Sequence, residues 1–240
     1  MIIIILILAL VIGFIYFLRF TLLRFKFDFN EKDMLMFFGL PGSGKTTVCA
    51  DIIRQILTYK KLKTVIPFVN FPMKGAYKID RDDIGSYDLS QPGKDKPLIL
   101  LDEASTVYMK RDAMTRKKDG TLKFGEAENK FFSMHRHYHT EVVMFAQSWD
   151  GVDLRLRELS TGLFYVEPSR LPGWIKIRKI SKIFTIDETH QPIDGYDFVR
   201  FSSRYVWARR CWKYFDTYDA PELPRIDPQK WYDRGDSNPS

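Results

Sequence analysis

From residue 34 onward, short apolar runs alternate with stretches that have helical periodicity. Continuous apolar runs bounded by turn residues are typical of buried parallel strands. The pattern predicts strands at 34–38, 63–68, 97–101 and 141–146, and helices at 45–59, 126–139 and 153–159. Such alternation predicts an α/β fold, in which a mostly parallel sheet is flanked by helices and ligand loops lie at the carboxyl ends of the strands. The charged segment 109–125 lacks periodicity and is expected to be an exposed loop.

The pattern changes in the C-terminal third. Residues 162–166 and 174–185 are rich in β-branched and aromatic side chains, with Pro and Gly between them, which predicts strands. Within the second run, isoleucines alternate with basic residues, and 205–218 is also aromatic and basic. We interpret this part as a β-rich extension with one buried face. Its basic outer face is a candidate for contact with single-stranded DNA.

The N-terminus begins with an apolar run from Met1 to Leu18, and only one arginine and one threonine interrupt the sequence up to Leu23. A helix of about 20 residues crosses the hydrocarbon core of a bilayer. A signal peptide would need positive charge before the run and a small-residue cleavage site after it, and both are missing. Because Arg19, Arg24 and Lys26 follow the run, we expect a single-pass transmembrane anchor with its N-terminus outside and the remainder in the cytoplasm.

A phosphate-loop motif lies between the first predicted strand and the first predicted cytoplasmic helix. Residues 39–46 read Gly-Leu-Pro-Gly-Ser-Gly-Lys-Thr and match the pattern G-x-x-x-x-G-K-[ST]. Glycines there allow successive N–H groups to surround phosphate oxygens, and the helix N-terminus favours the anion. We expect nucleotide to be bound by Gly39, Pro41, Gly42, Ser43, Gly44, Lys45, Thr46 and Thr47.

The chemistry of this site follows from a second motif, the apolar run 98–101 followed by Asp102 and Glu103. The end of a buried parallel strand would deliver Asp102 beside the phosphate loop, where it would hold Mg²⁺ together with the Thr46 hydroxyl. Lys45 would reach the β- and γ-phosphates. Glu103 would polarise a water for attack, which favours hydrolysis over transfer to an acceptor hydroxyl. The sequence therefore predicts a P-loop ATPase that uses ATP and Mg²⁺.

Further polar residues are candidates for catalytic roles. Gln147 ends the strand at 141–146, where its amide would contact the γ-phosphate or the attacking water; an ordinary strand cap is the alternative. Arg136 is a candidate electrostatic partner of a phosphate or of an acidic group in the core. Arg155 and Arg157 are candidates for an arginine finger supplied to a neighbouring subunit. For each arginine, a surface salt bridge is the competing interpretation.

Composition adds limits rather than a function. The chain has 45% hydrophobic and 28% charged residues, which is typical of a globular body. Its two cysteines are far apart and suggest reduced thiols rather than a disulfide framework. A net charge of +7 fits either nucleic acid or anionic lipid as a partner. The predicted organisation is an anchor at 1–23, a P-loop ATPase core at 24–160, a β-rich part of the same domain at 161–225 and a tail at 226–240.

Several of these stretches together carry a family resemblance: 39–46, 69–72, 100–104, 135–137 leading to 142–147, and 213–219. They resemble the zonula occludens toxin (Zot) family of P-loop ATPases, which includes the assembly and secretion ATPases of filamentous phages. The resemblance covers about residues 33–220. It implies ATP-driven assembly or extrusion of a single-stranded-DNA phage at the inner membrane of the host, with phage coat or DNA-binding proteins, or a nucleoprotein filament, as partners.

The resemblance leaves other arrangements open. Family members usually place the membrane span after the ATPase domain, whereas this chain places it first, so a separate protein could contact an outer channel. An ATP-driven DNA translocase of the conjugation or segregation type is one alternative function. A nucleotide-gated scaffold at the membrane is another. By analogy with related motors, we expect a homo-oligomeric ring.

Overall fold

The computed structural model describes residues 2–80, 83–85, 89, 96–104, 126–186 and 192–215. The helices are α1 (Ile2–Leu22), α2 (Lys45–Thr58), α4 (Glu126–Met134) and α5 (Leu154–Leu159), with short 3₁₀ turns at Lys60–Leu62 and Ala208–Arg210. The strands are β1 (Met34–Phe38), β2 (Val65–Val69), β3 (Tyr77–Lys78), β4 (Lys96–Leu101), β5 (Glu141–Ala146), β6 (Gly162–Pro168), β7 (Trp174–Ile186), β8 (Pro192–Phe198) and β9 (Arg204–Trp207).

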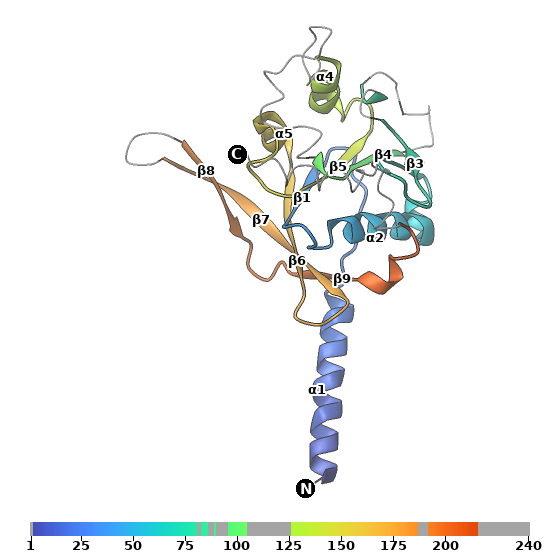
Figure 1. Ribbon diagram of the computed structural model, residues 1–240, viewed down its shortest axis with the longest axis vertical. Coiled ribbons are helices and arrows are strands. Elements are labelled where there is room, and N and C mark those ends of the chain that lie inside the picture. Colours follow the sequence, from blue (N-terminus) through green and yellow to red (C-terminus); the bar gives the residue numbers. More distant parts are fainter. Residues whose placement is uncertain are drawn as a thin grey trace, which may run out of the picture.

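The strands of the described residues form one nine-stranded sheet in the order β3-β2-β4-β5-β1-β6-β7-β8, with β9 paired to β7 (Figure 1). All neighbouring pairs from β3 to β6 are parallel. The pairs that β7 makes with β6, β8 and β9 are antiparallel. The predicted α/β fold with a mostly parallel sheet is confirmed, and the predicted β-rich C-terminal part continues the same sheet.

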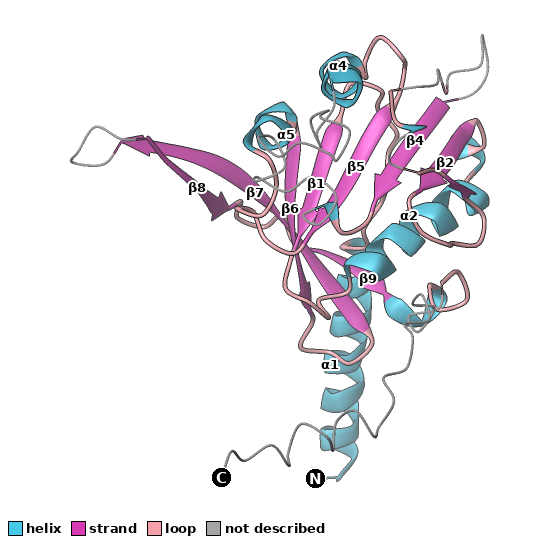
Figure 2. Cartoon of the chain, turned by 45° about the horizontal axis from the view of Figure 1, so that its top comes forward, coloured by secondary structure: helices cyan, strands magenta, loops and turns pink. Residues whose placement is uncertain are grey.

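Two apolar cores cover the two faces of the sheet, because alternate residues of each strand point to opposite sides. In β1, Phe37 faces the core that contains α2, while Met36 and Phe38 face the core that contains Phe132 of α4 and Leu156 of α5. Figure 2 shows α2 on one side of β1, β5, β4 and β2, and α4 and α5 on the other. This packing places the helices on both faces, and because the strands are parallel, the loops after β1, β4 and β5 begin at the same edge of the sheet.

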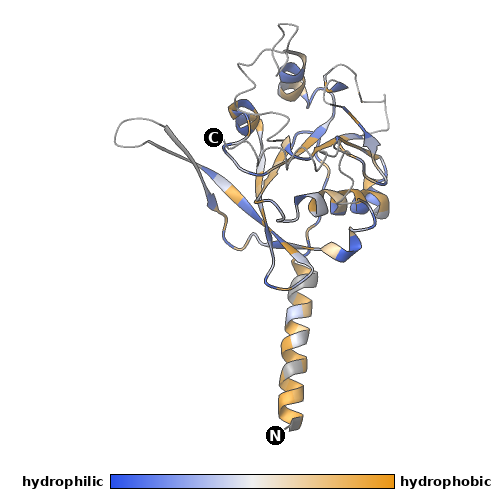
Figure 3. Cartoon of the chain, in the orientation of Figure 1, coloured by the Kyte–Doolittle hydropathy of each residue, from blue (hydrophilic) through white to orange (hydrophobic). Residues whose placement is uncertain are grey.

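Helix α1 projects away from the body of the molecule (Figure 1), and most of its described residues are hydrophobic (Figure 3). Its large apolar side chains are exposed; Phe14 is 63% and Phe17 is 68% accessible. Nowhere in the described part of the chain does a helix combine the length and the apolar character required to cross a bilayer. The structure thus confirms a helix at the N-terminus but does not confirm the predicted transmembrane span.

The chain passes from α1 into the body without a free linker. The Tyr205 N–H donates to the Leu23 carbonyl, and the Phe25 N–H donates to the Tyr205 carbonyl, both at 2.9 Å. The Gln55 side chain in α2 then accepts from the Phe27 N–H at 3.0 Å and donates to the Phe25 carbonyl at 3.3 Å. Because Phe25 and Phe27 are also buried, the segment after α1 is fixed to the helix that follows the phosphate loop.

Some predicted boundaries differ from the structure. The helix predicted to reach 139 ends at Met134, because the carbonyl of His135 accepts from the N–H groups of Tyr138 and Thr140 and closes turns in place of another helical turn. Strands β3 and β8 were not predicted. The predicted loop at 109–125 and the predicted tail at 226–240 lie outside the described residues.

Candidate nucleotide-binding site

The phosphate loop connects β1 to α2 and depends on its glycines in two ways. Gly42 and Gly44 have φ angles of 75° and 96°, a left-handed conformation that glycine adopts without a steric cost. Gly39 is required for packing, because a Cβ there would come within 2.2 Å of the Val166 carbonyl oxygen of β6. A Cβ on Gly44 would lie 2.3 Å from Cδ1 of Ile175 in β7. The C-terminal strands therefore press directly against the loop.

Lys45 starts α2 with its side chain folded back along the loop. Its ammonium group donates to the carbonyls of Gly39 at 2.8 Å and Leu40 at 3.1 Å. Burial lowers the pKa of Lys45, and the negative charges of Asp102 and Glu103 act against that shift. The hydroxyl oxygen of Ser43 is buried and has no hydrogen-bond partner within the described residues. A cation, an unpaired hydroxyl and a helix N-terminus together fit a bound phosphate.

Asp102 joins the second motif to the first. It follows the last residue of β4, and the Thr46 hydroxyl donates to its Oδ2 at 2.8 Å. Burial raises the pKa of Asp102, while the hydrogen bonds from Thr46 and from the Glu103 N–H lower it. A hydroxyl and a carboxylate in contact beside a phosphate loop are oxygen ligands of the kind that Mg²⁺ prefers. Thr46 and Asp102 would hold that ion.

Asn70 is a positioning residue for Asp102 whose role the sequence did not reveal. It follows β2, and its amide forms two hydrogen bonds with the Asp102 backbone. Asn70 Oδ1 accepts from the Asp102 N–H at 2.8 Å, and Nδ2 donates to the Asp102 carbonyl at 2.9 Å. This pair fixes the backbone at the point where β4 ends. The available signal was an amide directly after a buried strand, within a stretch already noted for its family resemblance.

Glu103 and Gln147 lie at the same edge of the sheet as the phosphate loop. Glu103 is exposed and has a φ of 52°, so the chain turns sharply after Asp102. Gln147 is exposed directly after β5, the strand between β4 and β1. The Gly39 N–H donates at 3.2 Å to the carbonyl of Ala146, the residue that precedes Gln147. The structure thus gathers Lys45, Thr46, Asp102, Glu103 and Gln147 at the carboxyl ends of three adjacent strands.

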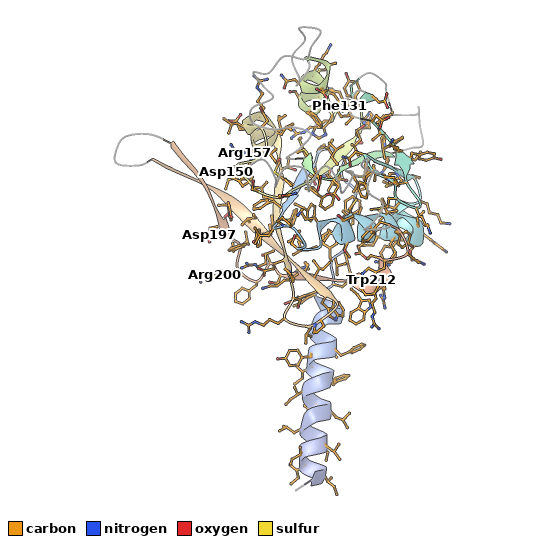
Figure 4. The ribbon with its side chains drawn as sticks, in the orientation of Figure 1. Phe131, Asp150, Arg157, Asp197, Arg200 and Trp212 are labelled. Carbon is orange, nitrogen blue, oxygen red and sulfur yellow. The ribbon has the colours of Figure 1, made fainter. Side chains whose placement is uncertain are left out.

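The candidate arginines are placed differently. Arg136 is exposed on the turn before β5, so it lies at the amino end of the strands and is not brought to the phosphate loop or to the core of its own chain. Arg157 is 4% exposed; its guanidinium lies 5.2 Å from the ring centre of Trp149 and 3.6 Å from Oδ1 of Asp150 (Figure 4). Arg155 is exposed on α5. A finger role for Arg155 or Arg157 at a neighbouring subunit stays a prediction.

The fold and the residues gathered at the carboxyl ends of β4, β5 and β1 define the class of the protein: an α/β domain with a phosphate loop between a parallel strand and a helix. The family model for zonular occludens toxin (Zot) matches residues 80–168. That segment contains Asp102, Glu103 and Gln147, while the phosphate loop precedes it. The resemblance to the Zot family is therefore confirmed by a part of the chain that is independent of the generic phosphate-loop motif.

One solved structure supports the fold, and two others are similar at lower TM-scores. The N-terminal domain of zonular occludens toxin from Neisseria meningitidis has 15% sequence identity and a TM-score of 0.50, with 77% of this chain and 98% of that chain covered. The genome packaging NTPase B204 from Sulfolobus turreted icosahedral virus 2, in complex with AMP, has 11% identity and a TM-score of 0.43, with 70% and 98% covered. Flagellar accessory protein FlaH from Methanocaldococcus jannaschii has 11% identity and a TM-score of 0.41, with 70% and 89% covered. No curated protein sequence matches this chain.

Proposed function

We propose that this chain is a membrane-anchored, Zot-like ATPase that powers the assembly and extrusion of a filamentous single-stranded-DNA phage through the inner membrane of its host. The observation that carries the proposal is the hydrogen bond between Thr46 and Asp102, which unites the phosphate loop with the acidic motif. The match of the Zot family model supports the cellular process.

Each residue of the edge has a chemical task in ATP hydrolysis. Lys45 exchanges its carbonyl partners for oxygens of the β- and γ-phosphates. Magnesium bound with ATP would supply positive charge that stabilises the transferring phosphate. Thr46 and Asp102 would hold the ion, and Asn70 keeps Asp102 in place. Glu103 accepts a proton from the attacking water, and Gln147 orients that water.

Attachment to the membrane is proposed to occur through α1, with the ATPase domain in the cytoplasm. The exposed apolar side chains of α1 and the basic residues after it support this part of the proposal. Phage coat or DNA-binding proteins, or their nucleoprotein filament, are the proposed partners, and the proposed active form is a homo-oligomeric ring. Flotation of the full chain with vesicles of phosphatidylcholine, which has no net charge, tests the attachment; recovery of the protein only in the lipid-free fraction would exclude it.

The catalytic part of the proposal is tested with Lys45→Ala and with Lys61→Ala as a matched control. Lys61 is exposed and pairs with Asp28, away from the phosphate loop. Phosphate release by the full chain in mild detergent, with ATP and Mg²⁺, should fall about 100-fold or more in Lys45→Ala, since a cation at the transferring phosphate is lost. It should stay within about twofold of the wild type in the control.

The same variants test the cellular role in a host that produces the phage. Lys45→Ala should abolish particle release without changing the amount of membrane-bound protein, and Lys61→Ala should support normal release. Normal particle yield from Lys45→Ala would contradict the proposal. Strong stimulation of phosphate release by naked duplex DNA would instead favour a DNA translocase.

A further inference from the structure

A pocket of about 600 Å³ lies between α1 and the hairpin that β6 and β7 form. Tyr16 of α1 lines one side, and the β6–β7 turn lines the other with Arg170 and Leu171, both exposed. Glu167 of β6, Lys176 and Arg178 of β7, and Tyr205 of β9 also line it. Figure 1 shows the β6–β7 turn beside the end of α1 that enters the body of the molecule. None of these residues takes part in the nucleotide site.

The charge of this pocket is positive. Glu167 pairs with Lys176 at 3.1 Å and with Arg178 at 3.0 Å, and Arg170 adds a third cation. Three basic side chains against one carboxylate leave an excess of two positive charges. Arginine and lysine together, next to tyrosine and serine hydroxyls, are suited to oxygens of a phosphate group. The pocket therefore fits an anion better than a neutral or cationic group.

The position of the pocket beside α1 indicates which kind of molecule carries the anion. Because Leu23 and Phe25 are hydrogen-bonded to Tyr205, α1 meets the body without slack, and insertion of α1 into lipid would hold this face at the membrane surface. Tyr16 lies about one and two-thirds turns before the end of α1, about 9 Å along the helix axis. A tyrosine at that depth, beside an exposed leucine and basic groups, is typical of the layer where lipid headgroups meet water.

We propose that this pocket, the headgroup pocket, binds the phosphate of an anionic phospholipid in the leaflet that surrounds α1. The phosphate oxygens accept hydrogen bonds from Arg170 and Lys176, and the acyl chains lie along the apolar surface of α1. The inference rests on the proposed attachment of α1 to the membrane. A free phosphate would meet the same cations but would leave the apolar wall of Tyr16 and Leu171 without a partner.

The headgroup pocket and the phosphate loop share the β6–β7 hairpin. Glu167 and Lys176 stand opposite each other in this hairpin. Their sequence neighbours, Val166 and Ile175, are the residues that contact Gly39 and Gly44 of the loop. If a bound phosphate draws Lys176 away from Glu167, the hairpin changes one residue away from the contacts of Val166 and Ile175 with the phosphate loop. Nucleotide turnover is therefore a second readout of lipid binding, besides affinity.

The test uses the full chain in an uncharged detergent, with phosphatidylglycerol as the anionic probe and phosphatidylcholine as the neutral one. Native mass spectrometry reports the fraction of protein that retains each lipid. The double variant Arg170→Gln/Lys176→Gln should retain phosphatidylglycerol about tenfold more weakly than the wild type, since each basic group near a lipid surface contributes to binding. The matched control Arg209→Gln/Arg210→Gln removes two exposed cations outside the pocket and should change retention less than twofold.

Equal retention of the two lipids by the wild type, or equal losses in the two double variants, would overturn the inference. Displacement of phosphatidylglycerol by millimolar inorganic phosphate would assign the pocket to a free anion instead. Unchanged melting temperature and ATP binding in Arg170→Gln/Lys176→Gln exclude misfolding as the cause of a loss. Flotation with phosphatidylcholine vesicles separates the two proposals: protein that floats but does not retain phosphatidylglycerol keeps its anchor and loses the headgroup pocket.

Discussion

Asp102 and Glu141 are carboxyl groups at opposite ends of two neighbouring strands. Asp102 follows the end of β4 and accepts hydrogen bonds from the Thr46 hydroxyl and the Glu103 N–H, near the charge of Lys45. Glu141 begins β5, has no exposed surface and accepts a hydrogen bond from the Asn30 N–H at 2.8 Å. Its second oxygen is buried without a hydrogen-bond partner among the described residues.

The two groups show that burial alone does not make a functional site. Burial raises the pKa of both carboxyls, and it raises that of Glu141 to about 9. Around Asp102, the charge of Lys45 and the hydrogen bonds from Thr46 and the Glu103 N–H oppose this rise in pKa. The oxygens of Thr46 and Asp102, which would bind Mg²⁺, are in contact. At the other end, polar side chains bind the backbone: the Thr161 hydroxyl accepts from the Met34 N–H at 3.1 Å, and His135 Nδ1 lies 2.8 Å from the Thr140 carbonyl oxygen. We infer that the polar groups at the carboxyl ends of the strands are arranged to bind a ligand, whereas those at the amino ends stabilise the backbone.

The largest effect expected at the carboxyl end of the strands is that of Glu103→Gln. Removal of the proposed proton acceptor should lower phosphate release about 1,000-fold, because general-base catalysis contributes on that order, while ATP stays bound. The matched control is Glu31→Gln at the other end of the strands, where Glu31 pairs with His139 at 3.0 Å. Phosphate release and retention of a fluorescent ATP analogue measure the two effects separately. Equal rates in Glu103→Gln and the wild type would remove Glu103 from the mechanism.

A smaller effect is expected from Asn70→Ala, which removes both hydrogen bonds to the Asp102 backbone. The rate of phosphate release should fall about 10- to 100-fold, as is usual when a residue that orients a metal ligand is lost. Because Asp102 would be misplaced rather than absent, the half-saturating Mg²⁺ concentration should rise, and excess Mg²⁺ should restore part of the rate. Asn30→Ala, which removes the Asn30–Asp33 side-chain bond, is the control. Loss of rate with an unchanged Mg²⁺ dependence would contradict a positioning role.

The sequence predicted the residues at the carboxyl ends of the parallel strands better than those at the amino ends. After a charged first residue, β4 and β5 are each an unbroken apolar run, and the residues that follow these strands belong to recognisable motifs. Their meeting at one edge of the sheet therefore followed from parallel pairing. Glu141 was predicted as part of a strand, but nothing local reveals that a charged residue is fully buried. Its burial depends on Asn30, which is 111 positions away. The contacts of Val166 and Ile175 with the phosphate loop also join residues that are far apart in the sequence. Strand β8 was not predicted because Asp194, Gly195 and Asp197 interrupt its apolar pattern.

The smallest effect, and the one that tests the amino end, is the pH dependence of stability in Glu141→Gln. With a pKa of about 9 in the fold against an ordinary value of 4.5, Glu141 holds a proton that the unfolded chain releases. The unfolded state therefore gains stability relative to the folded state as the pH rises between about 5 and 9, and the wild type loses stability over this window. Glutamine still accepts from the Asn30 N–H but does not titrate.

The stability of Glu141→Gln relative to the wild type should therefore increase with pH. Near pH 5 the variant should be less stable by about 1–3 kcal/mol, because its NH₂ group occupies the site of an oxygen that has no hydrogen-bond partner. The difference should shrink or change sign near pH 9. Thermal unfolding of both chains from pH 5 to 9 measures it, with Glu31→Gln as the surface control. Parallel curves for Glu141→Gln and the wild type would mean that Glu141 is ionised in the fold and that the two ends of the sheet treat their carboxyl groups alike.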